Sequence, residues 1–490
     1  MRRSLVVTAA VAAVLATVGA VALASVNATP KRPVEQAAAS PGELAPLSAR
    51  RVVTGWLPYW DLPEALSSVL SEPSVFAEVS PFWYRVTTSA QVAAMEGNEQ
   101  PESELIDAIE QLHGAGIAAL PTVKDDDFDG HDMARLLRDR DRRKTLVDQI
   151  DAMVSRTGAD GVDIDFEGMN FGGSGRERTD IKRLYPVFLG QLQKRLHAQS
   201  KTLSVALPPR RSHGDSYWEV IDYRAISGVV DRARVMTYDY STDSPGPVAP
   251  YAWTKQVAAY AQKEFRGVPL SIGVPAYGRN WYLTTLRGKC PPVTEQTTTP
   301  TTVQALALAE QFSAAPEWSK SAREYHYDYR RPYPEYGRCV TERSVWFGDS
   351  RSAAERLLLA KHLGVQGIAV FSFGSEDSRL LTRAAALAAG FEPAKARVTI
   401  AAPTTAAAAD QISITGTAAV RGIPVASAEI VLQRRAHQGA WDDVATATSD
   451  ESGRVEFDVT INGSTSWRLR VAAGWDWARS NSEVRRTTVS

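Results

Sequence analysis

Short apolar segments alternate with amphipathic stretches from residue 51 to about residue 390. Eight of the apolar segments have the length and the β-branched or aromatic content of strands. In chain order they cover residues 52–56, 75–80, 118–123, 161–167, 203–207, 234–238, 270–274 and 367–373. Between them, stretches such as 143–154 and 353–363 have apolar residues at helical spacing. Eight strands that alternate with helices within roughly 340 residues predict an α/β fold, a (β/α)8 TIM barrel over residues 50–392.

The pattern changes after about residue 390. Apolar side chains there recur at every second position, as in Val455, Phe457 and Val459, and turn residues separate the segments. This predicts an all-β sandwich of immunoglobulin-like character over residues 396–490.

Three tryptophans of this C-terminal segment, Trp441, Trp475 and Trp477, could form a carbohydrate platform or belong to its core. We favour the core, and we expect the sandwich to be a spacer or a module for cell-wall association.

The excursion between the seventh and eighth predicted strands, residues 282–350, is too long for a plain loop. We expect an inserted α+β subdomain there. It contains both cysteines of the chain, Cys290 and Cys339. In an exported protein two cysteines predict one disulfide, and the alternative is two buried thiols.

Residues 1–28 have the pattern of an export signal. Two arginines precede an apolar run from residue 5 to about residue 26, which ends near small-residue cleavage sites. The run favours a cleaved signal peptide, although it is also long enough for an uncleaved N-terminal anchor. Residues 29–49 contain four prolines and predict a disordered linker. We therefore expect a secreted, cell-surface or cell-wall-associated protein.

Charge and composition exclude several classes of function. The 490 residues carry a formal net charge of −1, which gives no electrostatic basis for binding nucleic acid. Two cysteines and seven dispersed histidines offer no metal-ligand spacing, so we expect no metal and no other cofactor. The acidic run at residues 125–129 could bind a cation or line a cleft, but we favour a solvated loop. We expect a monomer.

The most informative segment contains Asp160, Asp163, Asp165 and Glu167 within eight residues of strand-like sequence. Alternate side chains of a strand share a face, so the last three acids should project together while the apolar residues between them pack on the other side. Like charges on a partly buried surface raise at least one carboxyl pKa, which keeps an acid protonated near neutral pH. A solvated edge strand or a calcium site is the alternative, and the flanking apolar residues and the strand-like spacing disfavour both.

The Asp-x-x-Asp-x-Asp-x-Glu pattern resembles the signature of family-18 glycoside hydrolases, the chitinase-type enzymes, at all four acidic positions. The resemblance implies that Glu167 donates a proton to the glycosidic oxygen. It also implies that Asp165 orients and polarises the N-acetyl group of the substrate and that Asp163 shares charge with Asp165.

Two further segments are similar to the same family. Met-Thr-Tyr-Asp, ending at Asp239, resembles the Met-x-Tyr-Asp of the sixth strand, which implies that Tyr238 and Asp239 contact the acetamido group and the reacting sugar. The segment around Tyr277 is similar to Gly-x-Pro-x-Tyr-Gly-Arg at the seventh strand, and Tyr277 and Trp281 would offer apolar faces to pyranose rings. The other candidates for substrate contact are Trp56, Asp160 and Phe371.

Phe371 departs from the family pattern. It aligns with a Trp that in many members forms the floor beneath the reacting sugar. A phenyl ring still stacks but covers less area, so we expect a change in affinity or sugar preference rather than in catalysis.

Carboxylates on one face of one strand cannot easily flank a glycosidic bond, as a conventional retaining glycosidase requires. In family 18 the 2-acetamido oxygen of the sugar attacks its own anomeric carbon instead. The expected function is retaining hydrolysis of β-linked N-acetylglucosamine, in chitin-type oligosaccharides or peptidoglycan glycan. Residues 80–84 and 345–350 look more like the bacterial branch that trims the cell wall and spore cortex, although its LysM repeats are not evident.

Two other interpretations compete with this one. A non-catalytic, chitinase-like carbohydrate-binding protein would typically have lost the acid at Glu167. An inactive wall-associated protein would rest on the C-terminal sandwich alone.

Overall fold

The computed structural model describes residues 51–490 except 127, 391–393, 421–422, 426–427, 437–438, 451 and 473–476. The predicted export signal (1–28), the predicted linker (29–49) and Trp475 lie outside the described residues. Among the described helices, none combines the length and the apolar character needed to cross a bilayer.

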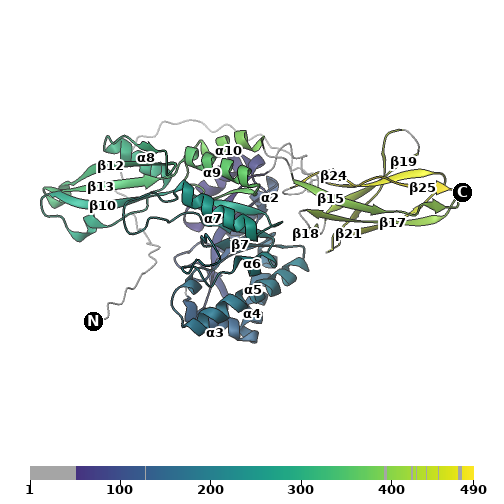
Figure 1. The fold of residues 1–490 in the computed structure, drawn as a ribbon, viewed down its shortest axis with the longest axis horizontal. Coiled ribbons are helices and arrows are strands. Elements are labelled where there is room, and N and C mark those ends of the chain that lie inside the picture. The colour runs from purple at the N-terminus through teal and green to yellow at the C-terminus, as the bar shows by residue number, and fades with distance from the viewer. Residues whose placement is uncertain are drawn as a thin grey trace. The chain divides into compact units, whose positions relative to one another are not determined.

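Eight parallel strands close into a barrel (Figure 1). Around it they follow the order β1-β14-β9-β8-β7-β6-β5-β2, and β1 pairs with β2 to complete the circle. Their bounds are Val53–Pro58 (β1), Glu78–Val86 (β2), Thr122–Lys124 (β5), Gly161–Asp165 (β6), Thr202–Leu207 (β7), Arg232–Val235 (β8), Leu270–Pro275 (β9) and Gly367–Phe371 (β14). Two short strands, β3 (Val92–Ala94) and β4 (Ala118–Ala119), pair with β2. The predicted barrel of eight strands is thus confirmed. The third predicted range, 118–123, falls on the two short strands β4 and β5, and the second and sixth predicted strands lie at Glu78–Val86 and Arg232–Val235 instead of 75–80 and 234–238.

Helices follow the barrel strands along the chain. They are α1 (Leu62–Ser71), α2 (Glu102–Gly114), α3 (Gly130–Arg138), α4 (Arg140–Thr157), α5 (Gly175–His197), α6 (Tyr223–Ser227), α7 (Tyr251–Glu264), α9 (Ser350–Leu363) and α10 (Leu380–Ala388). Helices α4 and α9 begin three residues before the predicted ranges because Asp139 and Asp349 cap them, each accepting two backbone N–H bonds.

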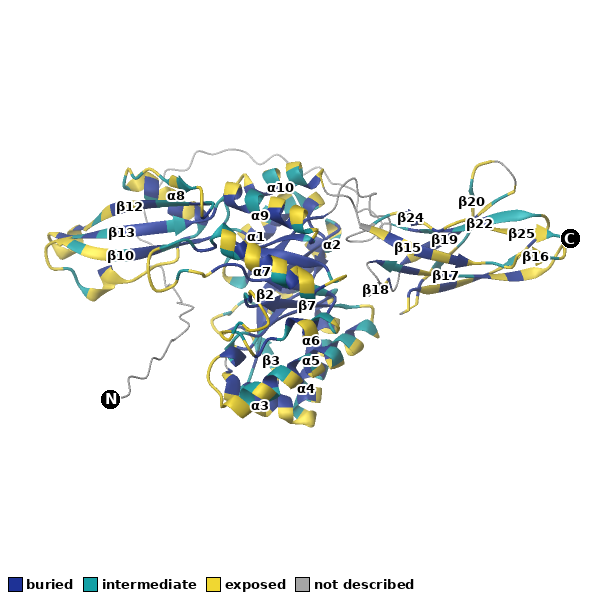
Figure 2. Ribbon diagram, in the orientation of Figure 1, coloured by how far each residue is buried: buried dark blue, intermediate teal, exposed yellow. Residues whose placement is uncertain are grey.

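The outer face of β6 packs against α5. Ile164 and Phe166 are fully buried, and the Phe166 ring lies 6.0 Å from Tyr185 and 5.9 Å from Phe188 of that helix. Burial of each such side chain contributes roughly 1.5–3 kcal/mol. The alternating acids of β6 therefore point to the interior of the barrel, where Figure 2 shows mostly buried strand residues.

The insert between β9 and α9 has its own four-stranded sheet, in the order β10-β13-β12-β11, and one helix. Its elements are β10 (Gly278–Arg287), α8 (Thr302–Gln311), β11 (Glu317–Ser319), β12 (Glu324–Tyr333) and β13 (Cys339–Phe347). Strand β10 begins four residues before the predicted boundary, at Gly278, where a Cβ would come within 2.6 Å of the Phe347 side chain. Cys290 and Cys339 form the predicted disulfide, with Cα atoms 5.1 Å apart.

The insert is attached to the barrel through a buried carboxylate. Glu324 of β12 accepts hydrogen bonds from the backbone N–H of Val248, at 2.8 Å, and of Ala249, at 2.7 Å. Arg356 of α9 lies 3.5 Å from the same carboxylate, and both side chains are 1% exposed. Burial raises the pKa of Glu324, and Arg356 opposes this increase.

The C-terminal module consists of two sheets. One has the order β18-β17-β15-β23 with β21 beside β17, and the other has the order β16-β25-β22-β19-β20 with β24 beside β22. Their strands are β15 (Ala394–Ala401), β16 (Thr405–Ala406), β17 (Gln411–Val420), β18 (Ile423–Pro424), β19 (Glu429–Arg435), β20 (Asp442–Thr448), β21 (Arg454–Thr460), β22 (Thr465–Val471), β23 (Trp477–Ala478), β24 (Ser480–Asn481) and β25 (Arg485–Val489).

Apolar residues of both sheets form one core. Ile414 and Phe457 come from the first sheet, and Leu432, Trp467 and Leu469 come from the second. Buried and exposed positions alternate along β17, as the bands in Figure 2 show. The all-β prediction agrees with these sheets, and the immunoglobulin-like character stays a prediction.

Candidate active site

Three carboxylates follow one another along β6 toward its carboxyl end: two lie in the strand and the third lies two residues beyond it. Asp163 and Asp165 lie within the strand and are 0% and 3% exposed, whereas the side chain of Glu167 is 33% exposed. Because Glu167 follows the carboxyl end of the strand, it lies at the mouth of the barrel where TIM-barrel active sites are built. The structure thus orders the acids from the barrel interior to the opening.

Asp163 is held by neutral donors and one cation. Its Oδ2 accepts hydrogen bonds from Trp56 Nε1, at 3.0 Å, and from Thr122 Oγ1, at 3.3 Å, and it lies 3.4 Å from Arg234 Nη1. The guanidinium is 1% exposed, so little water screens this pair. These contacts fix the position of the Asp163 carboxylate inside the barrel.

Asp165 is the acid whose protonation the site favours. Burial first, and the neighbouring Glu167 second, raise its pKa well above the usual value for Asp. Lys124 Nζ lies 3.8 Å from its Oδ2 and opposes the shift. Its Oδ1 is buried without a hydrogen-bond partner among the described residues. The site can therefore hold the Asp165 carboxyl group in its neutral form.

Two residues at the end of β5 belong to this site although the sequence did not single them out as catalytic candidates. Lys124 Nζ donates to Glu167 Oε1 at 3.2 Å. Asp125 is fully buried and accepts hydrogen bonds from the backbone N–H groups of Glu167, Gly168 and Met169 at 2.7–3.0 Å. Burial raises the pKa of Asp125 to about 7, although the three N–H donors and Lys124 oppose the increase.

The acidic run at 125–129, favoured as a solvated loop, is instead anchored at its first residue. Asp125 accepts hydrogen bonds from the backbone just after β6. Its neighbour Asp126 has Oδ1 3.4 Å from Lys124 Nζ. Within the described residues, no group of three or more His, Cys, Asp or Glu is placed to hold a metal ion.

An aromatic wall faces the acids. The Phe371 ring contacts Trp56, Tyr238 and Tyr277 with centroids 5.7–6.4 Å apart. Burial first, then the charges of Asp165 and Glu167, raise the pKa of Tyr238 well above its usual value. Tyr238 therefore stays a neutral hydrogen-bond donor.

Asp239 follows Tyr238 in a left-handed backbone conformation, with φ of 58°. Asp tolerates this region better than most residues, but the conformation still costs energy and often marks a functional position. Its Oδ1 accepts from the Tyr277 hydroxyl at 2.8 Å and from Arg279 Nη2 at 2.6 Å. The carboxylate is thus fixed at the opening by two neighbouring donors.

Three predicted substrate contacts are not supported by the geometry. Asp160 precedes β6 at the opposite end of the barrel, where it accepts from the backbone N–H of Ala119 at 2.9 Å and lies 2.7 Å from His113 Nε2. Trp56 and Trp281 are 1% and 2% exposed, so neither offers a free ring face. Trp56 instead positions Asp163, and Trp281 packs at the base of the insert.

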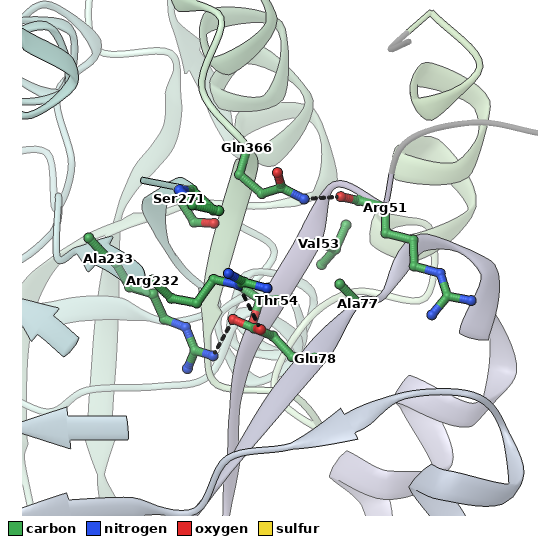
Figure 3. A pocket seen from close by; sticks show the side chains of 11 residues that line it. Arg51, Val53, Thr54, Ala77, Glu78, Arg232, Ala233, Ser271 and Gln366 are labelled. Atoms are coloured by element: carbon green, nitrogen blue, oxygen red, sulfur yellow. Dashed lines mark hydrogen bonds and ion pairs between the residues drawn. The ribbon is translucent and has the colours of Figure 1, made fainter. Parts of the chain in front are cut away.

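The opposite, amino-terminal mouth of the barrel contains a small pocket (Figure 3). Glu78 at the start of β2 lies 3.1 Å from Arg232 Nε and 3.2 Å from Arg234 Nη2. Arg234 thus reaches from Glu78 to Asp163 through the barrel interior. One buried carboxylate there has two guanidinium partners.

The sequence profile of "Glycosyl hydrolases family 18" matches residues 122–376, half of the chain. The chain belongs to glycosyl hydrolases family 18. The matched region begins in β5 and ends just after β14, so it contains the carboxylates of β6, Tyr238, Asp239 and the aromatic wall.

Relatives within family 18 cover the same region. The chain is 26% identical over 294 residues to a protein named as a sporulation-specific glycosylase of Bacillus subtilis (strain 168), covering 60% of this chain and 64% of the relative. It is 28% identical over 246 residues to the cortical fragment-lytic enzyme of the same strain, covering 49% of this chain and 52% of the relative. The chain thus spans less than two thirds of the length of either relative.

A solved structure has the same fold. The spore cortex-lytic enzyme SleL of Bacillus megaterium QM B1551 superimposes with a TM-score of 0.58 at 21% identity, over 70% of this chain and 75% of that one. Family 18 membership and the barrel fold therefore rest on independent observations.

Proposed function

We propose that the protein is an exported glycoside hydrolase that cleaves β-linked N-acetylglucosamine bonds with retention of configuration. The observation that carries the proposal is the graded row of acids on β6, which leaves Glu167 at the opening, Asp165 buried behind it and Asp163 fixed by Trp56 and Arg234. This arrangement supplies a proton donor and a group to hold an amide, both on one side of the barrel mouth.

The chemistry divides between substrate and protein. Glu167 gives its proton to the glycosidic oxygen as the bond to the anomeric carbon breaks. The 2-acetamido carbonyl oxygen attacks that carbon from the other face and forms an oxazolinium ring. Asp165 holds the acetamido N–H, and Tyr238 donates to the carbonyl oxygen. Glu167, now ionised, then takes a proton from the water that opens the ring, which restores the starting configuration.

The substrate class follows from this division of roles. A sugar without an N-acetyl group at C2 lacks the nucleophile, so glucan and de-N-acetylated glucosamine should not be hydrolysed. Relatives named as a sporulation-specific glycosylase and a cortical fragment-lytic enzyme favour bacterial cell-wall glycan over chitin as the polymer.

Mass spectrometry of products tests the substrate. The protein would be incubated with chitin oligomers and with purified peptidoglycan, and fragments ending in reducing N-acetylglucosamine are expected from at least one. Proton NMR of the first turnover should show the β anomer. An initial α anomer, or efficient cleavage of glucan, would refute the mechanism.

The competing function is carbohydrate binding without hydrolysis. Glu167 favours the enzyme, because a binding protein has no use for a proton donor at the barrel mouth. Binding of oligomers with no product after prolonged incubation would support the competing function.

Export, a monomeric state and wall association through the C-terminal module complete the proposal. Trp441 is half-buried, and the Arg435 and Arg468 guanidiniums lie 4.6 and 4.3 Å from its ring centre, so a sugar would have to compete with them for the ring. Sedimentation of the protein with purified cell walls, compared with a variant that ends after α10, tests the association.

A further inference from the structure

A buried ammonium group lies beside the acid that must donate a proton. Lys124 Nζ is 3.2 Å from Glu167 Oε1, 3.8 Å from Asp165 Oδ2 and 3.4 Å from Asp126 Oδ1. Its side chain is 12% exposed, and the Phe82 ring lies 5.4 Å from Nζ. The contacts place the cation between the mouth of the barrel and its interior.

Strand pairing makes this position specific. Lys124 is opposite Asp165 in the parallel register of β5 and β6, so its side chain follows the same face as the acids. Burial alone would lower the pKa of Lys124, but the charges of Glu167, Asp165 and Asp126 more than compensate and raise it. The lysine is therefore charged throughout the pH range in which a carboxyl group titrates.

A fixed cation affects a general acid in a defined direction. It stabilises the ionised carboxylate relative to the protonated form, so the carboxylate becomes protonated only at a higher proton concentration, that is, at a lower pH. Because hydrolysis requires protonated Glu167 in the free enzyme, the upper pH limit of kcat/KM should be lower than it would be without the lysine.

The other charges around Glu167 act on the same equilibrium. Asp126 is 41% exposed and shares the lysine, which weakens the influence of Lys124 on Glu167. Asp165 of β6 and Tyr238 after β8 interact electrostatically with Glu167. The charged groups next to these two are Asp125 after β5, Asp163 of β6 and Asp239 after β8, and Arg234 of β8 is paired with Asp163. Tyr185 of α5 lies near Asp125, Asp163 and Asp165 rather than near Glu167.

We propose that Lys124 is a positioning residue that favours the ionised form of Glu167, lowers the upper pH limit of hydrolysis and is counteracted by Asp126. The inference rests on the proposed function. It adds a contact that sets the pH range of the same site. The expected consequence is that substitutions of the two residues shift the pH profile in opposite directions.

The kinetic test measures kcat/KM against pH on an N-acetylglucosamine oligomer. Lys124→Met should move the upper half-activity point up by about one pH unit or more, and Lys124→Arg should restore most of the wild-type position. Asp126→Asn should move it down by a few tenths of a unit, since the residue is partly exposed. Lys144→Met removes a lysine that is ion-paired with Asp148 on α4 and serves as the matched control, with no shift expected.

A second measurement needs no activity. In protein labelled with 13C at the glutamate carboxyl carbon, the signal of Glu167 is the one that disappears in Glu167→Gln. Its titration midpoint should be higher in Lys124→Met and lower in Asp126→Asn than in the wild type. If Lys124→Met does not fold, Asp126→Asn alone decides the direction.

The outcomes separate the two proposals. Unchanged pH limits and an unchanged midpoint in both variants, or a shift of the same sign in both, would overturn the role of Lys124. A wild-type protein that hydrolyses no N-acetylglucosamine glycan would overturn the proposed function, and the NMR titration would still decide whether Lys124 controls Glu167.

Discussion

The two mouths of the barrel contain the same kinds of charged residue in opposite proportions. At the amino-terminal mouth one carboxylate, Glu78, has two guanidinium partners, Arg232 and Arg234. Toward the carboxyl-terminal mouth four acids share two cations. Arg234 is paired with Asp163, and Lys124 interacts with Asp165, Glu167 and Asp125. The first set is satisfied, whereas the second has more buried acids than cations.

This difference suits the amino-terminal mouth to stabilising the fold and the carboxyl-terminal mouth to catalysis. Where the one carboxylate has two guanidinium partners, the ion pairs connect β2 with β8. Where buried acids exceed cations, burial favours the protonated form of at least one of them, and at this mouth that acid is Asp165. Arg234 is paired with Glu78 at one mouth and with Asp163 toward the other. The ratio of acids to cations, rather than the type of residue, therefore decides the role of each mouth.

The strongest test removes the proton donor. Glu167→Gln should lower kcat by about 10²–10⁴-fold or more while the midpoint of thermal unfolding stays near that of the wild type, because shape is preserved and only the acid is lost. Glu110→Gln, at an exposed site on α2, is the control and should leave turnover unchanged. Near wild-type hydrolysis by Glu167→Gln would show that the proton comes from elsewhere.

The excess of acids also predicts how stability depends on pH. Burial raises the pKa of Asp125 to about 7 in the folded protein from an ordinary value of 3.8, so between these values the folded state keeps a proton that the unfolded chain releases. Its contribution is complete below pH 4 and is lost as pH rises through 7, by up to about 4 kcal/mol.

Denaturant unfolding at several pH values between 4 and 8 measures this contribution. The difference in unfolding free energy between the wild type and Asp125→Asn should change along that range, because Asn cannot titrate. A constant difference across the range would mean that Asp125 is ionised in the folded state.

At the amino-terminal mouth we expect a substitution to lower stability strongly and activity only slightly. Glu78→Ala leaves two guanidiniums without their shared carboxylate, and Arg234 is buried, so we expect a loss of about 3 kcal/mol in unfolding free energy. Activity per folded molecule should fall by less than about tenfold, because Glu78 does not contact Asp165 or Glu167. A loss of turnover as large as that of Glu167→Gln would remove the distinction between the mouths.

The smallest expected effect concerns the aromatic wall. Phe371→Trp enlarges the ring surface next to Tyr238, so KM should fall by roughly two- to tenfold with little change in kcat. Phe373→Trp, at a fully buried position against Phe76, is the control and should lower stability instead. An unchanged KM in Phe371→Trp would mean that the ring does not contact the sugar.

Local patterns predicted the parts of the site that depend on local geometry. Asp163, Asp165 and Glu167 share a face because a strand has a period of two, and Ile164 and Phe166 pack outside for the same reason. The eight strands followed from apolar runs of the right length, and the disulfide followed from the count of cysteines.

Residues that depend on pairing between distant segments were missed. Lys124 reaches Glu167 only because β5 and β6 are neighbours in a register that places Lys124 opposite Asp165. The prediction that Asp160 contacts substrate overlooked a local distance instead, since five residues of strand separate it from Asp165 by about 17 Å. Trp281 lies in β10 of the insert and is 2% exposed, and its motif does not predict that burial.

The ion pair between Glu324 and Arg356 limits how far the protein can be shortened by engineering. The insert resembles an accessory that could be deleted to leave a minimal barrel, yet its Glu324 satisfies two backbone N–H groups before α7 and the guanidinium of α9. Replacing residues 278–347 by a short linker would leave the two N–H groups without this acceptor and Arg356 without its counter-charge, although Arg356 would still donate to the carbonyl oxygens of Ala249 and Ser352. A minimal barrel therefore has to carry a substitute for that carboxylate, or have Arg356 and the chain at residues 248–249 redesigned at the same time.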